Sequence, residues 1–131
     1  MAKLLVADDL VPIRQMVRIT LSTQGWTIVE AKNGNEALEL VRSEKPDLVL
    51  LDVDMGPGPN GFDVCRQIKA DEVTKDIPVV MLTSSQEERD VVESYGIGVN
   101  SYIVKPVDFN QFVHAVSEVG LYWNTLNKLP Y

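Results

Sequence analysis

The sequence has a single cysteine and no apolar run long enough to cross a membrane. Cys65 is the only thiol, so an internal disulfide is excluded, which suits a reducing compartment. No window approaches the roughly 18 apolar residues that a membrane span needs. The N-terminus reaches Asp8 after a short apolar stretch and so lacks the apolar core of a signal peptide. These absences predict a cytoplasmic protein.

Positive charge is also scarce. The chain has 12 Lys and Arg against 19 Asp and Glu, a formal net charge of −7. Binding to nucleic acid or to an anionic membrane depends on basic residues, so we expect neither among the partners. Clustered carboxylates attract a divalent cation or a basic partner instead.

What is present is typical of one globular α/β domain. Of the 131 residues 45% are hydrophobic and 24% charged, and there is no internal repeat or low-complexity linker. Short apolar strands are expected at residues 3–7, 26–31, 47–52, 77–82 and 100–104. Helical periodicity falls between them, at about 12–24, 36–43, 61–70, 86–95 and from 108 to about 119. The alternation predicts a parallel sheet, joined by right-handed crossovers and covered by helices on both faces.

Two of these helices carry finer expectations. The polar helix at 86–95 has Val91, Val92 and Tyr95 as its apolar anchors. The periodicity of the last helix is compatible with a continuation through Tyr122, Trp123 and beyond.

Polar or ionisable residues follow four of the apolar strands. They are Asp8 and Asp9, Asp52, Thr83 and Lys105. The carboxyl ends of parallel strands meet at one edge of the sheet, so these side chains are expected to converge there. One of them could be chance, but four together predict a polar site.

The composition of this site favours phosphoryl transfer. Three neighbouring carboxylates repel one another unless a cation intervenes, and Mg²⁺ prefers oxygen ligands of this kind. With a cation present Asp52 can stay ionised and attack an electrophilic phosphorus. Lys105 offers a positive charge and Thr83 a hydroxyl to the incoming phosphoryl oxygens.

The motifs at these strand ends resemble a known family. They are Asp-Asp after the first strand, Leu-Leu-Asp-Val-Asp-Met after the third, Leu-Thr-Ser after the fourth and Tyr-Ile-Val-Lys-Pro after the fifth. Over residues 3–120 the chain resembles a two-component response-regulator receiver domain of the chemotaxis-regulator kind. The resemblance implies a doubly wound, flavodoxin-like fold with five helices and strand order 2-1-3-4-5. It implies a receiver domain at 1–120, a C-terminal extension at 121–131 and no separate output domain.

The resemblance also implies a phosphoacceptor and a metal site. Asp52 would accept a phosphoryl group from a histidine kinase or a phosphotransfer protein. Asp9, Asp52 and the backbone carbonyl of Asp54 would ligate Mg²⁺, and Asp8 would contact it directly or through water. Such a protein phosphorylates and dephosphorylates itself but is not a turnover enzyme.

A switch is implied as well. Thr83 and Lys105 would bond the phosphoryl group, Tyr102 would turn from an outward to an inward rotamer, and the peptide bond between Lys105 and Pro106 would be cis. The surface made by the helix at 86–95, the last strand and the last helix would then change and be read by a partner protein, whose identity the sequence leaves open.

One loop departs from the family pattern. Gly56-Pro57-Gly58-Pro59 makes the segment after Asp52 one residue longer and displaces its proline. Asp54 adds a carboxylate there, which could either slow or speed attack by water on the phosphoryl group.

Two alternatives to the switch stay open at this point. Asp52 and Asp54 also resemble the Asp-x-Asp motif of haloacid-dehalogenase-like phosphatases, although that family places its acidic pair last and the chain shows no cap domain. A flavodoxin-like cofactor binder would need a Gly/Ser/Thr-rich phosphate loop after the first strand, which is missing.

The C-terminal part carries a second, weaker resemblance. Residues 95–123 are similar to stand-alone receivers associated with phytochrome-type kinases. Exposed aromatics in this part would favour a homodimer or a kinase contact. Two other residues have plain structural interpretations: Cys65 as a core residue and His114, the only histidine, as a surface residue of the last helix.

Overall fold

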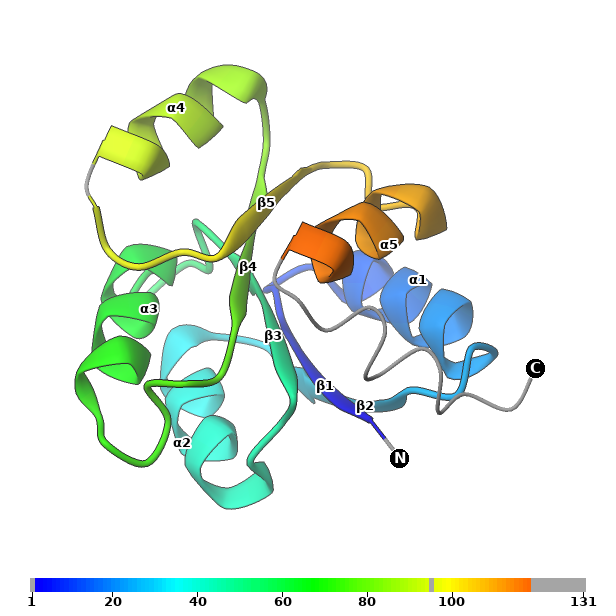
Figure 1. Cartoon of the computed structure of the whole chain (residues 1–131), viewed down its shortest axis with the longest axis horizontal. Helices are drawn as coiled ribbons and strands as arrows, with labels where there is room; N and C mark the ends of the chain where they lie inside the picture. The colour runs from blue at the N-terminus through cyan, green and yellow to red at the C-terminus, as the bar shows by residue number, and fades with distance from the viewer. Residues whose placement is uncertain (1, 95, 119–131) are drawn as a thin grey trace.

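Five parallel strands form the centre of the molecule in the order β2-β1-β3-β4-β5 (Figure 1). The structure, a computed structural model, describes residues 2–94 and 96–118. Its strands are β1 (Lys3–Ala7), β2 (Thr27–Ala31), β3 (Leu48–Asp52), β4 (Val79–Thr83) and β5 (Ser101–Val104). Its helices are α1 (Val11–Ser22), α2 (Gly34–Glu44), α3 (Gly61–Ala70), α4 (Gln86–Ser94) and α5 (Phe109–Glu118). The predicted fold class and strand order are confirmed.

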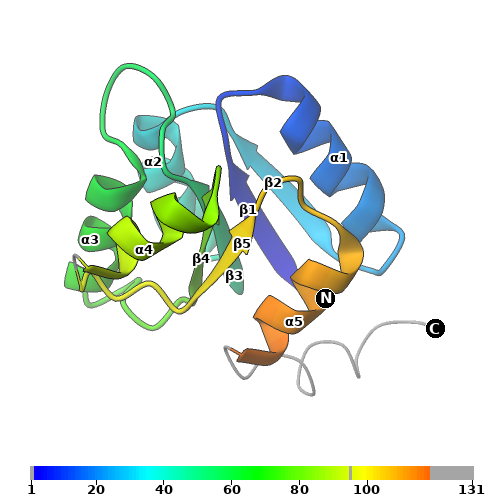
Figure 2. The same ribbon diagram turned by 90° about the horizontal axis from the view of Figure 1, so that it is seen from above.

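The sheet separates two apolar clusters. Helices α1 and α5 cover one face, where Val17, Leu21 and Phe112 pack on side chains of every strand. Helices α2, α3 and α4 cover the other face through residues such as Val41 and Ile68 (Figures 1 and 2). The central strands β1 and β3 are therefore buried on both sides, which explains their unbroken apolar sequence.

Side chains along a strand point alternately to the two faces of the sheet, and this alternation determines to which face each polar residue at a strand end is directed. Asp8, Asp52 and Lys105 continue the alternation of Val6, Leu50 and Ile103, whose side chains lie on the face covered by α1 and α5. Thr83 instead continues the alternation of Met81, on the opposite face. Because side chains point alternately to the two faces, Asp8, Asp52 and Lys105 are directed to the same side of the sheet end.

The carboxyl end of β3 is held by the start of α3. Asn60 caps this helix, since its side chain accepts a hydrogen bond from the Asp63 amide while Asp63 accepts one from the Asn60 amide. The Gly61 amide donates to the Val53 carbonyl at 2.8 Å. A Cβ on Gly61 would collide with the carbonyl oxygen of Asp52. The strand end and the helix can thus approach this closely only because residue 61 is glycine.

Two details of the predicted elements are wrong. Strand β4 was expected at 77–82, but it runs from Val79 to Thr83. Pro78 has no amide hydrogen to donate, and its carbonyl accepts from the Val49 amide just before the strand begins. In α4 Val92 is buried, whereas Val91, predicted as a second anchor, is 50% exposed. Only one of two consecutive helical residues can point directly at the sheet.

Some expectations lie outside the described residues. These are the anchor Tyr95, the continuation of α5 beyond Glu118 and the C-terminal extension at 121–131. None of the helices described within 2–94 and 96–118 is long and apolar enough to cross a membrane.

The close approach at Gly61 makes a testable prediction. Gly→Ala in a helix normally stabilises a protein by about 0.5–1 kcal/mol, through helix propensity and reduced freedom of the unfolded chain. Here the added methyl group must displace the end of β3, so Gly61→Ala is expected to lower the free energy of unfolding by about 1–3 kcal/mol. Urea denaturation measures this change. Ser43→Ala, at an exposed position of α2, serves as the control, and a stabilised Gly61→Ala variant would contradict the assigned contact.

Candidate functional site

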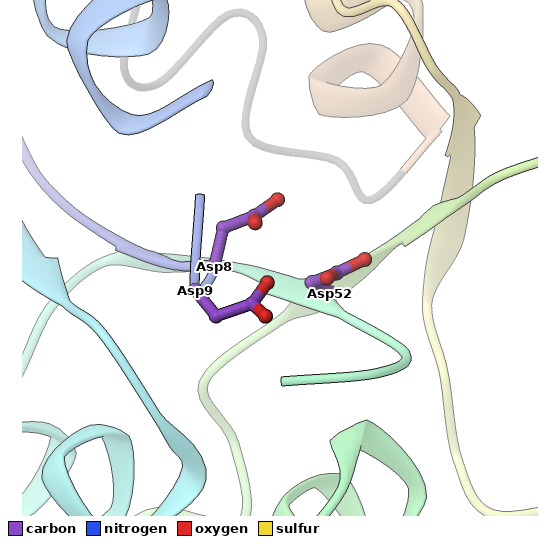
Figure 3. A group of neighbouring side chains, drawn as sticks. All are labelled: Asp8, Asp9 and Asp52. Carbon is purple, nitrogen blue, oxygen red and sulfur yellow. The ribbon is translucent and has the colours of Figure 1, made fainter. Parts of the chain in front are cut away.

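Three aspartates meet at the carboxyl end of the sheet (Figure 3). Asp8 and Asp9 follow β1, and Asp52 is the last residue of β3. One carboxylate oxygen from each lies within 4.8 Å of the others. Asp8 is fully buried, Asp52 is 6% exposed and Asp9 is open to solvent. The predicted acidic cluster is therefore present, with one side accessible from outside.

Lys105 joins two of these carboxylates. Its Nζ lies 2.9 Å from Asp8 Oδ2 and 3.0 Å from Asp52 Oδ1. The Lys105 amide also donates to the Thr83 carbonyl at 2.8 Å, which extends the pairing of β5 with β4 to this residue. The peptide bond between Lys105 and Pro106 is cis, as expected. Lys105 is thus placed to neutralise charge at the phosphoryl-transfer site predicted from the sequence.

Arg14 supports the cluster and was missed at the level of sequence. Its guanidinium donates to the Asp8 carbonyl at 2.7 Å and to Glu30 at 3.1 Å. The Asp8 carboxylate in turn accepts from the Leu10 amide at 3.0 Å. The sequence did contain a hint of this role. Arg14 lies near the N-terminus of α1, where a positive charge is unfavourable to the helix dipole, and the first turn of α1 has no acidic residue to pair with it. Such a residue is expected to have a specific partner.

Burial and like charge act on the nucleophile candidate. Burial raises the pKa of Asp52 from 3.8 to about 6, and the neighbouring Asp8 and Asp9 add to the rise, while the hydrogen bond and charge of Lys105 oppose it. For Lys105, burial alone would lower the pKa, but hydrogen bonds to Asp8 and Asp52 raise it above its ordinary value. Lys105 therefore stays charged at neutral pH, and its hydrogen bond and charge do not fully offset the effect of burial on the pKa of Asp52.

Thr83 and Tyr102, the residues predicted to form the switch, lie on β4 and β5. Thr83 is fully buried, and among the residues described its Oγ1 has no hydrogen-bond partner. Asp52 pairs with Leu82 in the sheet, so Thr83 lies one position beyond it on the adjacent strand. Tyr102 is half-buried on β5, and burial raises the pKa of its phenol. The buried hydroxyl of Thr83 can therefore form a new hydrogen bond without breaking one among the residues that the structure describes.

The unusual loop after Asp52 is held at both ends. At its far end a Cβ on Gly34, the first residue of α2, would collide with the Pro59 carbonyl. Within the loop Gly56 and Gly58 have φ of 78° and 96°, a region that favours glycine. The exposed Asp54 carboxylate accepts from the Gly56 amide at 3.2 Å, so it stabilises its own turn.

The donor set fits a hard divalent cation. Three carboxylates converge, and one of them is exposed. Oxygen ligands of this kind suit Mg²⁺, which keeps several waters and needs an accessible position. Asp8, Asp9 and Asp52 are the residues that could hold it.

Comparison with known proteins identifies the family. Residues 4–117 match the model of the response regulator receiver domain. The chain belongs to this family. The receiver domain is 38% identical over 116 residues to the phosphate regulon transcriptional regulatory protein PhoB of Pseudomonas aeruginosa, covering 88% of this chain and 50% of PhoB. It is 36% identical over 119 residues to protein PilH of the same organism, covering 91% of this chain and 98% of PilH. The chain thus spans about half the length of PhoB and nearly all of PilH.

Solved structures agree with this assignment. The bacteriophytochrome response regulator AtBRR is 36% identical, with a TM-score of 0.86 and coverage of 98% of this chain and 99% of that one. The chemotaxis response regulator CheY4 of Vibrio cholerae is 31% identical, with a TM-score of 0.82 and coverage of 91% and 98%. Both resemblances stated from the sequence, to chemotaxis-type and to phytochrome-associated receivers, are therefore confirmed.

Family membership decides between the functions considered above. Receiver domains are phosphoryl-accepting switches of two-component signalling, and they bind Mg²⁺ at an acidic pocket. Histidine kinases or phosphotransfer proteins phosphorylate them. The comparisons give no support to the phosphatase alternative.

The raised pKa of Asp52 makes a prediction about stability. A carboxyl whose pKa is higher in the folded than in the unfolded protein stabilises the fold when protonated, and this contribution is lost as the pH rises from about 4 through about 6. Asp52→Asn is therefore expected to stabilise the metal-free protein by about 1–2 kcal/mol at pH 7.5, and much less at pH 4.5.

Chemical denaturation in the presence of a chelator at the two pH values measures this difference. Asp54→Asn changes an exposed carboxylate two residues away and serves as the matched control. Destabilisation by Asp52→Asn at pH 7.5 would show that the Lys105 ion pair outweighs burial and like charge.

Proposed function

We propose that Asp52 is the phosphoacceptor of this receiver domain and that its donor is a histidine kinase or a phosphotransfer protein. One observation carries the proposal: Asp52, at the end of β3, lies 3.0 Å from the Lys105 ammonium and within the same cluster as Asp8 and Asp9. A nucleophilic carboxylate is thereby combined with a cation for phosphoryl oxygens and with ligands for a metal.

The chemistry follows from these groups. The ionised Asp52 carboxylate attacks the donor's phosphorus, forming an acyl phosphate as the bond to the donor's nitrogen or oxygen breaks. Asp8, Asp9 and Asp52, with the backbone carbonyl of Asp54, would hold Mg²⁺. When bound, Mg²⁺ supplies positive charge that keeps the carboxylates ionised and stabilises the phosphoryl oxygens.

Lys105 and Thr83 would then recognise the product. The ammonium of Lys105 contacts Asp52 Oδ1, so it already lies beside the carboxylate to which a phosphoryl group would be attached. Thr83 Oγ1, which has no partner among the residues that the structure describes, would gain one on bonding the phosphoryl group. Satisfying this buried hydroxyl gives the phosphorylated state a contact that the other state lacks.

The consequence would be a changed surface. Movement of Thr83 would draw Tyr102 inward, with Pro106 and the rest of the segment after β5 in the same region, and so alter the face made by α4, β5 and α5. We infer that output is by protein contact on this face, with a downstream partner or a second copy of the chain, and not by turnover of a substrate. A cytoplasmic location is consistent with the free thiol of the buried Cys65.

The first test is direct labelling of Asp52. Incubation with Mg²⁺ and acetyl phosphate, followed by intact mass measurement, is expected to show one phosphoryl adduct on the wild-type chain and none on Asp52→Asn. The matched variant Asp54→Asn, two residues away, is expected to keep the adduct, because the Asp54 side chain contacts its own loop. An adduct that survives in Asp52→Asn would place the phosphoacceptor elsewhere, and multiple turnover of unrelated phosphate esters would favour a phosphatase.

A second test concerns Lys105. Lys105→Ala removes the charge beside Asp52 while leaving all three metal-binding carboxylates, so Mg²⁺ binding measured by calorimetry is expected to persist. Transfer from acetyl phosphate is expected to slow by roughly tenfold or more, since a preorganised cation at the phosphoryl oxygens is lost. Lys75→Ala, an exposed lysine paired with Glu72, is the control. Unchanged transfer in Lys105→Ala would remove the role assigned to this residue.

A further inference from the structure

Helix α4 and strand β5 are joined by a contact between Arg89 and Tyr102. The guanidinium carbon of Arg89 lies 5.1 Å from the centre of the Tyr102 ring. Arg89 Nε is held in turn by Glu93 Oε1 at 3.1 Å, one helical turn further along α4. This distance is within the range of a cation–π interaction, in which the positive charge is attracted to the face of the ring.

The start of α4 is tightly determined, so the position of Arg89 is too. The Glu88 amide donates to Ser85 Oγ at 3.1 Å, and the Glu88 carboxylate accepts from the Ser84 amide at 2.6 Å. The Arg89 amide donates to the Ser85 carbonyl at 3.1 Å. Ser84 and Ser85 directly follow Thr83, so a displacement of Thr83 is passed through these hydrogen bonds to the first turn of α4.

Thr83 and Tyr102 are also neighbours across the sheet. In the β4–β5 register Met81 pairs with Tyr102 and Thr83 pairs with Val104. Thr83 and Tyr102 are therefore diagonal neighbours on the same face, close enough for an aromatic side chain to interact. Tyr102 thus has Thr83 as a diagonal neighbour in the sheet and Arg89 of α4 over its ring.

We propose that Arg89 is a positioning residue of the switch: its contact with Tyr102 stabilises the arrangement of α4 and β5 seen in this structure and opposes the movement of Thr83 and Tyr102 on phosphorylation. The proposal rests on the function proposed above, because it assigns a restraint to that same switch. A contact present in only one of two states shifts the equilibrium by its own free energy. For a half-exposed cation–π pair this corresponds to about a two- to fivefold change in apparent affinity for the phosphoryl group.

The ion pair with Glu93 alone would not have this effect. The two side chains are 38% and 47% exposed, and a solvent-accessible i,i+4 pair of this kind contributes little and stays within α4. The ring of Tyr102 belongs to β5, so of these two contacts of Arg89 it is the one with Tyr102 that reaches from α4 to β5. Glu93 contributes by holding the guanidinium in place over the ring.

The experiment follows Tyr102 by NMR of protein carrying ¹³C-labelled tyrosine, with its signal assigned from Tyr102→Phe. Beryllofluoride with Mg²⁺ serves as the phosphoryl analogue. The test variants are Arg89→Gln, which removes the charge, and Arg89→Lys, which keeps it. The matched control is Arg66→Gln, since Arg66 is an exposed arginine on α3 with a comparable helical ion pair, at 3.5 Å from Asp63.

Arg89→Gln is expected to move the Tyr102 signal of the free protein toward its position in the beryllofluoride complex. It should also lower the half-saturating beryllofluoride concentration about two- to fivefold. Arg89→Lys should lie nearer the wild type, and Arg66→Gln should match it. A Tyr102 signal unmoved in free Arg89→Gln, or a half-saturating concentration that is unchanged or raised, would overturn the proposal.

Failure of the proposed function would look different. In that case the wild-type chain itself would show no saturable beryllofluoride adduct and no adduct from acetyl phosphate at Asp52. The coupling assigned to Arg89 would then also be refuted, whereas the signal of Tyr102 in the free variants would still report whether the contact exists.

Discussion

Crowded negative charge at one end of the sheet is the constraint on which the rest of this structure depends. The parallel arrangement brings Asp8, Asp9 and Asp52 together, and the Lys105 ammonium contacts both Asp8 and Asp52. This single cation does not offset burial and mutual repulsion, because the pKa of Asp52 still rises to about 6. A site in this condition favours the binding of additional positive charge, such as a divalent cation, and the proposed phosphoryl transfer to Asp52 would need that charge as well.

The arrangement around the cluster separates two tasks. On the side of α1 and α5, Arg14 and the Leu10 amide hold Asp8 in place, so that part of the site is rigid. On the side of α4 and β5, Thr83 has a buried hydroxyl without a partner among the residues described, and Tyr102 is held by a modest contact. The first side holds Asp8 in place, and we propose that the second side transmits a change at Asp52.

Sequence patterns predicted the fold and the aspartate cluster because both follow from the alternation of apolar strands with helices along the chain. Apolar strands ending in Asp8, Asp52, Thr83 and Lys105 are enough to place these residues at one sheet edge. The patterns did not reveal contacts set by three-dimensional packing. The pairing of Arg14 with the Asp8 carbonyl and the collision that a side chain on Gly61 would cause depend on how helices close over the sheet. The start of β4 at Val79 likewise depends on the pairing with β3, in which the Val49 amide donates to the Pro78 carbonyl.

Two glycines, Gly34 of α2 and Gly61 of α3, pack against the two ends of the loop after Asp52, and this has a further consequence. Gly34 and Gly61 each meet a backbone carbonyl so closely that no side chain fits, so the loop is anchored at Pro59 and at the end of β3. Between these anchors a change in loop length is expected to leave the strands and helices in place, because surface loops tolerate insertions and deletions. Differences in length there are therefore confined to the rim of the acidic cluster, where they alter what can approach Asp52 and leave the framework unchanged.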